Sequence, residues 1–333
     1  MLFCLMRQYR WGIIGPGKIA NKFAAALPLA GNALLTAVAS RDAARTRSFA
    51  AAHGAEHCYE SYEQLATDPA VDAVYIATPH GFHAEHALLC LRQGKAVLCE
   101  KPMALNARQV GEMVAAAQHH RAFLMEAMWT RFLPLMQQII ELIERGKIGQ
   151  LKYIQANFGF LAPFQPTGRL YDLRLGGGSL LDIGIYPLFL CLQLLGEPDN
   201  IHAAGQLTPT GVDETCNAIL GYRDGRSAVI SSTLACQTSL TAEIAGTEGL
   251  IRIPSPWYKN DRLLLIRPGE KEEANQLEPM VNGFEYQIRE VTRCLETGLI
   301  ESPYMSHAFS LTMSRTMDAI RGQIGVKYPA AGE

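Results

Sequence analysis

The sequence has no surplus of basic residues. Its 333 residues hold 30 Lys and Arg against 32 Asp and Glu, a formal net charge of −2, and no block of Lys or Arg stands out. Binding to phosphate backbones requires a basic surface. We therefore expect no nucleic-acid partner.

Long hydrophobic runs are also missing. No stretch approaches the ~20 apolar residues of a membrane-spanning helix, and the apolar N-terminal run is too short for a signal peptide. We therefore expect no membrane association. Apolar residues make up 48% of the chain and charged residues 19%, which is ordinary for a globular protein, and the length suggests two domains.

Closely spaced cysteine pairs are absent. Eight cysteines are scattered along the chain, and no two have the C-x-x-C spacing of a zinc ribbon or a thioredoxin-like motif. Buried, reduced thiols of a cytoplasmic protein are the expectation. His80 and His83 have no nearby Cys or carboxylate set to complete a metal site, so we expect no metal.

The first third of the chain alternates short apolar segments with helix-like segments. Such a pattern is typical of a parallel sheet covered on both faces by helices. It predicts a doubly wound α/β domain of the Rossmann type over residues 1–125. The expected strands cover residues 11–14, 34–39, 73–77, 96–99 and 122–125.

From residue 126 to 333 the strand-like segments become longer and partly alternating. They indicate an α+β domain with a mostly antiparallel sheet, and Asp224-Gly225 is a hairpin signal between two of them. The expected strands are 151–158, 214–222, 227–234, 240–245, 249–253 and 262–266, and the expected helices include 135–145, 179–195 and 283–296.

A glycine-rich turn follows the first expected strand. Gly15 permits a tight turn, Gly17 lets the backbone approach a pyrophosphate, and the small Ala20 allows close packing of helix on sheet. Lys18 and Ile19 open the helix on which the pyrophosphate would sit. The motif alone also matches plain turns, but its place in a βαβ series predicts dinucleotide binding.

Ser40 and Arg41 follow the second expected strand, where an NAD enzyme usually carries Asp or Glu for the ribose hydroxyls. A hydroxyl beside a guanidinium suits the 2′-phosphate of NADP. The plain alternative is a solvated Arg that precedes a helix capped by Asp42. The residue types favour NADP over NAD as the cofactor.

Polar side chains follow two further strands, at the edge where ligands of such sheets bind. Thr78, Pro79, His80 and His83 come after the third strand and could touch the nicotinamide or the ribose. Glu100 and Lys101 come after the fourth. A Lys beside the cationic ring of an oxidised nicotinamide can have a lowered pKa and aid proton transfer, although a Lys at a strand end can also be merely exposed.

The segment from Gly176 to Tyr186 carries a second candidate group. Asp182 and Tyr186 are four residues apart, so one face of a helix can present both. A Tyr near a cationic Lys can exchange a proton with a hydroxyl, while the Asp holds the substrate. A half-buried helix with a core Tyr is the structural alternative. Aromatic clusters around Trp129 and Arg131 and at Trp257 can form a substrate wall or pack between domains.

These segments together resemble the glucose-fructose oxidoreductase/inositol dehydrogenase family over essentially the full chain. The residues that carry the resemblance are 11–19, 100–103, 125–132 and 181–186. Most of that family has His where this chain has Tyr186, and a branch that oxidises trans-dihydrodiols or D-xylose with NADP has Tyr. The difference argues against a typical inositol dehydrogenase and against the NAD-dependent glycosidases of the family.

The resemblance implies that Lys101, Asp182 and Tyr186 are catalytic and that Trp129, Phe158 and Trp257 line an aromatic substrate pocket. It also implies a large open sheet in the second domain that forms a homodimer interface. The expected reaction is hydride transfer between NADP and a secondary alcohol, a cyclic hemiacetal sugar or a trans-dihydrodiol. The alternatives are a reductase of another carbonyl or an imine, and a non-catalytic NADP-binding regulator.

Overall fold

A computed structural model describes residues 7–333, and the chain divides into two compact units. The first unit holds the residues up to Ala104, Arg108–Trp129 and Asn282–Leu311. The second holds Leu105–Ala107, Thr130–Val281 and Thr312–Glu333. Cys4 lies outside the described residues, and the other seven cysteines are free thiols.

The first unit is built on a six-stranded sheet in the order β3-β2-β1-β4-β5-β6, and every strand pair in it is parallel. This order confirms the doubly wound fold. The strands are β1 (Tyr9–Ile14), β2 (Ala33–Ala39), β3 (His57–Tyr59), β4 (Ala73–Ile76), β5 (Ala96–Glu100) and β6 (Leu124–Ala127).

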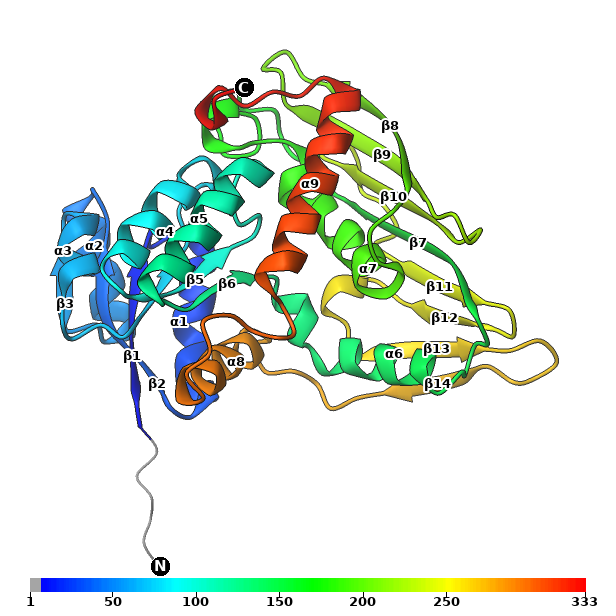
Figure 1. Cartoon of the computed structure of the whole chain (residues 1–333), viewed down its shortest axis with the longest axis horizontal. Helices are drawn as coiled ribbons and strands as arrows, with labels where there is room; N and C mark the ends of the chain where they lie inside the picture. The colour runs from blue at the N-terminus through cyan, green and yellow to red at the C-terminus, as the bar shows by residue number, and fades with distance from the viewer. Residues whose placement is uncertain (1–6) are drawn as a thin grey trace, which may run out of the picture. The chain divides into compact units, whose positions relative to one another are not determined.

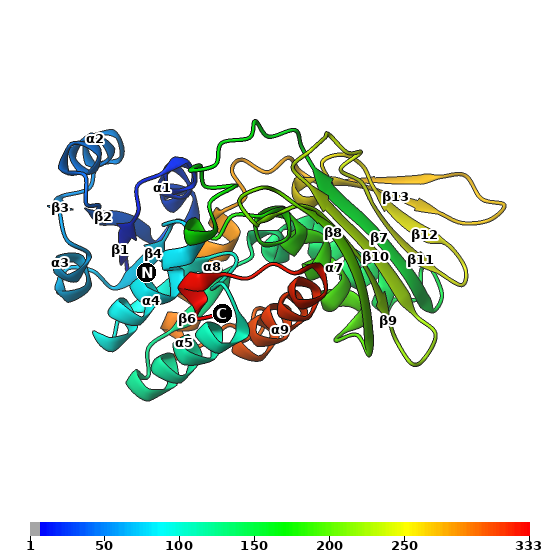
Figure 2. The same ribbon diagram turned by 90° about the horizontal axis from the view of Figure 1, so that it is seen from above.

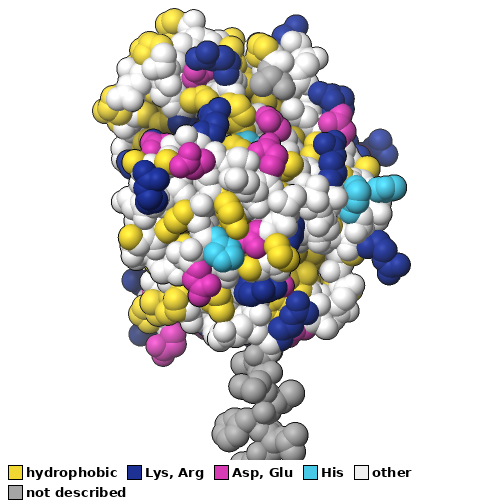
Figure 3. Space-filling view, turned by 90° about the vertical axis from the view of Figure 1, so that its left-hand side faces the viewer, with side chains coloured by type: hydrophobic (Ala, Val, Ile, Leu, Met, Phe, Trp, Pro, Cys, Tyr) yellow, Lys and Arg dark blue, Asp and Glu magenta, His cyan; other side chains and the backbone are white. Residues whose placement is uncertain are grey.

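Helices cover both faces of this parallel sheet (Figures 1 and 2). They are α1 (Lys18–Ala30), α2 (Ala43–His53), α3 (Tyr62–Thr67), α4 (His83–Arg92), α5 (Ala107–His120) and α8 (Glu285–Glu296). The apolar side chains of α3, α4 and α5 pack on one face, around Leu65, Leu91 and Met113. Basic and acidic side chains are interspersed on the outer side of the unit, near α2 and α3 (Figure 3).

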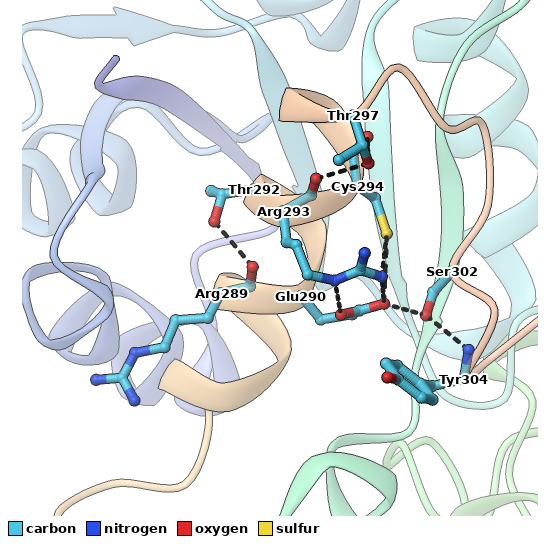
Figure 4. Close-up of polar contacts among 8 residues, drawn as sticks. All are labelled: Arg289, Glu290, Thr292, Arg293, Cys294, Thr297, Ser302 and Tyr304. Carbon is cyan, nitrogen blue, oxygen red and sulfur yellow. Dashed lines mark hydrogen bonds and ion pairs between the residues drawn. The ribbon is translucent and has the colours of Figure 1, made fainter. Parts of the chain in front are cut away.

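The segment Asn282–Leu311 returns to the first unit late in the chain. Figure 4 shows the buried carboxylate that secures it: Glu290 accepts hydrogen bonds from Arg293 at 2.7 and 2.8 Å, from the Ser302 hydroxyl and from the Cys294 thiol. On the other side of α8, Arg289 donates to the Leu29 carbonyl of α1 at 2.6 Å. The return is therefore fixed by polar as well as apolar contacts.

The second unit contains an eight-stranded sheet in the order β14-β13-β12-β11-β7-β10-β9-β8. All its pairs are antiparallel except β7 with β10, which confirms a mostly antiparallel sheet. The strands are β7 (Leu151–Gly159), β8 (Asn200–Leu207), β9 (Asp213–Gly221), β10 (Ser227–Thr233), β11 (Ala242–Gly246), β12 (Leu250–Ile253), β13 (Arg262–Ile266) and β14 (Glu273–Gln276).

One face of this large sheet is buried, and helix α7 (Ile185–Leu195) lies against it (Figure 2). Side chains alternate along the strands, as Ile154 and Ala156 of β7 are buried while Lys152 and Gln155 are exposed. The Asp224-Gly225 turn joins β9 and β10 as expected, with Gly225 at φ 84°. Helix α6 (Pro134–Glu144) also belongs to this unit.

Several elements differ from the sequence expectations. Strands β3, β8 and β14 and helix α9 (His307–Ile324) were not predicted. The expected single helix over 179–195 begins instead with a π-helical turn, Leu180–Gly184, before α7. The region Leu173–Leu195 has the length and mean hydropathy, 1.6, of a membrane-spanning helix, contrary to expectation, but 89% of its most apolar window is buried inside the protein.

Candidate functional site

The glycine turn after β1 has the geometry that a phosphate cradle needs. Gly15 has a φ of +90°, and a Cβ there would lie 2.9 Å from the backbone of Ala77 and Thr78. Only glycine meets both conditions. The Gly15 N–H donates to the Ala39 carbonyl at 3.1 Å, so the turn is tied to the end of β2.

Gly17 leaves open space at the start of α1. The nearest atom to a Cβ at Gly17 is the Gly15 carbonyl oxygen at 4.0 Å, and no side chain among the described residues caps the helix. The unpaired first-turn N–H groups can therefore bind a pyrophosphate. Ala20 is fully buried against the sheet, and Lys18 is exposed. These residues fit a dinucleotide.

Ser40, Arg41 and Asp42 lie at the carboxyl end of β2. Asp42 caps α2 by accepting the Arg45 N–H at 3.0 Å, as in the plain alternative for this segment, and its own N–H donates to the Ser40 hydroxyl at 3.1 Å. The Arg41 side chain is exposed, with its guanidinium 5.9 Å from the centre of the Phe82 ring. Asp42 is thus occupied by the helix, while Arg41 can serve a ligand.

Two histidines follow β4 beside Thr78 and Pro79. His80 is buried, and its ring lies 5.5 Å from that of the fully buried His83. Both ring nitrogens of His83 lie 2.8 Å from backbone carbonyls, those of Pro102 and Thr78. Burial lowers the pKa of His83, so at neutral pH the ring carries one N–H and donates to one carbonyl at a time. Among residues 7–333, no group of three or more His, Cys, Asp or Glu could hold a metal.

Glu100 and Lys101 lie where β5 ends. Glu100 is buried, accepts a hydrogen bond from the Tyr75 hydroxyl, and accepts the Lys101 N–H at 3.2 Å. The carboxylate therefore fixes the backbone from which the partly exposed Lys101 side chain projects. Lys101 follows the strand next to β4.

Asp182 belongs to the π-helical turn of the second unit. Arg169 binds it with two hydrogen bonds, from Nη1 at 2.7 Å and from Nη2 at 3.3 Å. A two-pronged, charge-assisted pair favours the ionised carboxylate and fixes its plane. The four-residue spacing of Asp182 and Tyr186 predicted a shared face of one α-helix. Asp182 instead lies in the π turn, and Tyr186 lies in the first turn of α7, which begins at Ile185.

A buried carboxylate holds this π turn. Asp213 is fully buried, and its Oδ2 accepts the Ser179 hydroxyl and the Leu180 N–H, each at 2.7 Å. Burial raises the pKa of Asp213 to about 6, against the lowering effect of these donors. Gly178 has a φ of +117°, and a Cβ there would lie 2.3 Å from Asp213 Oδ1, so this glycine allows the close approach.

Aromatic rings surround Tyr186. Phe158, at the end of β7, lies 5.5 Å from the Tyr186 ring and stacks on Tyr258 at 4.3 Å. Tyr258 also lies 5.3 Å from Tyr186. The indole of Trp257 donates to the Asn157 carbonyl at 2.9 Å, and its ring lies edge-on to that of Tyr258 at 6.4 Å. Tyr258 therefore joins the aromatic cluster beside the predicted Trp257.

Trp129 and Arg131 fall in different units. Trp129 belongs to the first, where its ring stacks on Phe284 at 5.1 Å. Arg131 belongs to the second and is buried, and its carbonyl accepts a hydrogen bond from Gln137 at 3.2 Å. Phe284 was not a predicted site residue, although it directly precedes the expected helix.

Each unit thus gathers part of the predicted site. In the first, the glycine turn, Ser40-Arg41, the histidine segment and Lys101 follow four adjacent strands, β1, β2, β4 and β5. In the second, Asp182, Tyr186, Phe158 and Trp257 lie around the π turn and the end of β7. Sequence reasoning missed Arg169 and Asp213, whose contacts with the π turn come from distant parts of the chain.

Comparison with known proteins gives consistent matches. The NAD-binding Rossmann-fold profile of the GFO/IDH/MocA oxidoreductases matches residues 9–128, and the profile of their C-terminal domain matches residues 136–252. A trans-1,2-dihydrobenzene-1,2-diol dehydrogenase of Xenopus laevis is 40% identical over 329 residues, covering 96% of this chain and 99% of that protein. The Homo sapiens protein of that name is 36% identical, covering 96% and 98%.

Solved structures agree. A 3-ketoreductase of Actinomadura kijaniata in complex with NADP and TDP-benzene has a TM-score of 0.86 at 28% identity, covering 96% of this chain and 98% of that chain. An aldose-aldose oxidoreductase of Caulobacter crescentus has a TM-score of 0.86 at 25% identity, covering 95% and 97%. The chain belongs to the GFO/IDH/MocA family of oxidoreductases, with an NAD(P)-binding Rossmann fold and relatives among the dihydrodiol dehydrogenases.

Proposed function

We propose that this oxidoreductase uses NADP to oxidise, reversibly, a secondary alcohol, a cyclic hemiacetal sugar or a trans-dihydrodiol. Residues 1–125 would bind the cofactor, and residues 126–333 the substrate. The observation that carries the proposal is the position of Lys101 at the end of β5, two strands from the glycine turn and three from Ser40-Arg41 in the same sheet. The relatives named as dihydrodiol dehydrogenases support the substrate class.

The choice of NADP rests on Arg41. No carboxylate among the described residues at the end of β2 is placed like that of an NAD enzyme, because Asp42 serves as the cap of α2. The exposed Arg41 and the Ser40 hydroxyl would bind the 2′-phosphate. Gly15, Gly17, Lys18 and Ile19 would hold the pyrophosphate. The segment from Thr78 to His83, with Glu100 and Lys101, would border the ribose and the nicotinamide.

The chemistry divides among three side chains. NADP, when bound, would supply the hydride acceptor for this oxidation. Tyr186, as the phenolate, would take the proton of the substrate hydroxyl, and Lys101 would donate a hydrogen bond to the same oxygen or to the Tyr186 phenolate. Asp182, oriented by Arg169, binds a neighbouring hydroxyl of the substrate. Phe158, Trp129, Arg131 and Trp257 would form the walls around it.

An absorbance assay at the NADPH band tests this proposal. The protein is incubated with NADP or NAD and a panel of aldoses, inositols and cyclic trans-diols. We expect turnover with NADP on aldoses or trans-diols. Tight NADPH binding with no turnover on the whole panel would instead favour a regulator, and turnover only on imines or linear aldehydes would favour the other reductase alternative.

We also infer a cytoplasmic homodimer that forms through the open face of the large sheet. The outward side chains of adjacent strands are partly apolar there: Ile219 of β9 is 52% exposed and lies opposite Val229 of β10. The exchange of Ile219 for Arg should turn the dimer into monomers, measured as molar mass by light scattering. A wild-type mass of one chain would contradict the inference.

A further inference from the structure

Glu126 is a buried acid in the first unit that the proposed chemistry does not use. It lies on β6, is 1% exposed and stands opposite Cys99 of β5. Its Oε1 accepts the Met103 N–H at 2.9 Å, and its Oε2 is buried without a hydrogen-bond partner among the described residues. A buried polar atom without a partner costs about 1–3 kcal/mol. Glu126 therefore carries an unsatisfied oxygen beside the hydrogen bond that it makes to the segment after Lys101.

The segment that Glu126 holds is the turn of Lys101. The turn consists of Lys101, Pro102 and Met103, and a side chain contacts the backbone of each residue. Glu100 accepts the Lys101 N–H, and a ring nitrogen of His83 lies 2.8 Å from the Pro102 carbonyl. Glu126 accepts the Met103 N–H. Glu126 ties the far end of this turn to β6, and the Cys99 thiol of β5 donates a longer hydrogen bond to the Met103 carbonyl at 3.5 Å. A change at Glu126 therefore reaches the Lys101 backbone through two residues.

We propose that Glu126 is a positioning residue for Lys101, and that the turn is held for catalysis when Glu126 is ionised. An ionised carboxylate accepts a shorter and stronger hydrogen bond from the Met103 N–H than a neutral acid does. The inference rests on the proposed function, in which Lys101 acts on the substrate oxygen.

The surroundings of Glu126 allow it to change charge near neutral pH. Burial raises its pKa to about 7, and Glu100 adds to the rise, while Ser310, the Met103 amide and Lys101 oppose it. Other titratable groups near this region include the Cys99 thiol of β5, His83 against the Pro102 carbonyl, and His307 of α9, whose Nε2 lies 3.0 Å from the Leu124 carbonyl and whose Nδ1 lies 3.6 Å from Glu301. Burial raises the pKa of Cys99 well above its usual value, so that thiol stays neutral.

Glu126→Gln tests the proposal, because the amide oxygen can still accept the Met103 N–H but cannot ionise. In the wild type, kcat should fall as the pH drops through about 7. In Glu126→Gln this fall of kcat at acidic pH, the acidic limb of the pH profile, should disappear. Above neutral pH the kcat of this variant should be about 10-fold lower than that of the wild type. The KM for NADP should stay within about 2-fold, since the glycine turn and Ser40-Arg41 lie on other strands.

Glu290→Gln is the matched control. Glu290 is also a buried acid of the first unit, but the partners in Figure 4 come from α8 and Ser302. This variant should lose thermal stability and keep the wild-type pH profile of kcat. Loss of the same limb in Glu290→Gln would show a general effect of lost stability and would overturn the proposal.

Two further variants keep the outcome decisive. If Glu126→Gln does not fold, Glu126→Asp retains the charge with a shorter reach, and the limb should move in pH. A limb that is unchanged in whichever variant folds overturns the proposal. Near-wild-type turnover of Lys101→Met would instead refute the proposed function, whereas an inactive Lys101→Met with an unaltered Glu126→Gln profile refutes only the role of Glu126.

Discussion

In each unit a buried carboxylate from another part of the chain accepts a backbone N–H from the candidate catalytic segment. In the first, Glu126 accepts a backbone N–H from the turn of Lys101, and in the second, Asp213 accepts one from the π turn of Asp182. In both acids the second oxygen is buried without a hydrogen-bond partner among the described residues. The difference lies in the donors: Asp213 has two donors on one oxygen, whereas Glu126 has a single backbone donor. The extra donor favours the ionised form, and burial raises the pKa of Asp213 to about 6 but that of Glu126 to about 7.

The largest expected effect on kcat comes from removing the candidate catalytic side chain of either unit. Lys101→Met and Tyr186→Phe should each lower kcat by about 1,000-fold or more, because each removes a partner of the proton that leaves the substrate. Circular dichroism and NADPH binding should show folded proteins. A variant that keeps near-wild-type turnover would remove its unit from the proposed chemistry.

Reversing the charge of Arg41 should affect only the binding of the cofactor, which we assign to the first unit. Arg41→Asp should raise the KM for NADP by about 100-fold, since paired charge-assisted hydrogen bonds to the 2′-phosphate are lost. The KM for NAD should change little. Steady-state kinetics with both cofactors measure this, and equal losses would refute the role of Arg41.

The second unit has its own ion pair at Glu333, in which the Arg321 side is buried. Glu333 binds Arg321, which is 2% exposed, at 2.8 and 2.9 Å and accepts the Tyr328 N–H at 3.1 Å. Glu333→Ala should lower the free energy of unfolding by about 2 kcal/mol, because the buried Arg321 guanidinium then keeps its pair with Asp318 at 2.6 Å but loses the other carboxylate. Asp224→Ala, which breaks a surface pair with Arg226, should cost less than about 1 kcal/mol. Denaturant unfolding compares the two, and equal costs would contradict the account.

The smallest expected effect is a change in how strongly the thermal stability depends on pH. Because burial raises the pKa of Asp213 to about 6, its contribution to stability is complete below the unfolded value of 3.8 and is lost as the pH rises through about 6. Asp213→Asn should therefore reduce the fall in Tm between about pH 5 and pH 7.5 by a few °C. Thermal scans at both pH values measure this, and an unchanged fall would place the ionisation elsewhere.

The sequence predicted the first sheet well because its strands are continuous apolar segments. Helix α2 starts directly after Asp42, the cap that the sequence offered, and Gly54 in a left-handed conformation ends it. Short β3 and the largely exposed β8 carry no such signal. Helix α9 was missed because Ser310, Ser314 and Thr316 are among its buried residues, so its buried face is not uniformly apolar.

The candidate site was predictable where the motif and the strand end coincide, as at Gly15, Arg41 and Lys101. Arg169 could not be found this way, because it reaches Asp182 from a loop with no pattern of its own. Nor does any sequence signal reveal that Asn282–Leu311 returns to the first unit, since its helix α8 is an ordinary amphipathic one.

The central claim is hydride transfer between an alcohol carbon and NADP. It is tested most directly with D-xylose deuterated at C1 and with benzene trans-dihydrodiol deuterated at its carbinol carbons. Mass spectrometry of the NADPH formed should find the deuterium in the nicotinamide ring with at least one of these substrates. No deuterium in the nicotinamide from either substrate would contradict the proposed reaction.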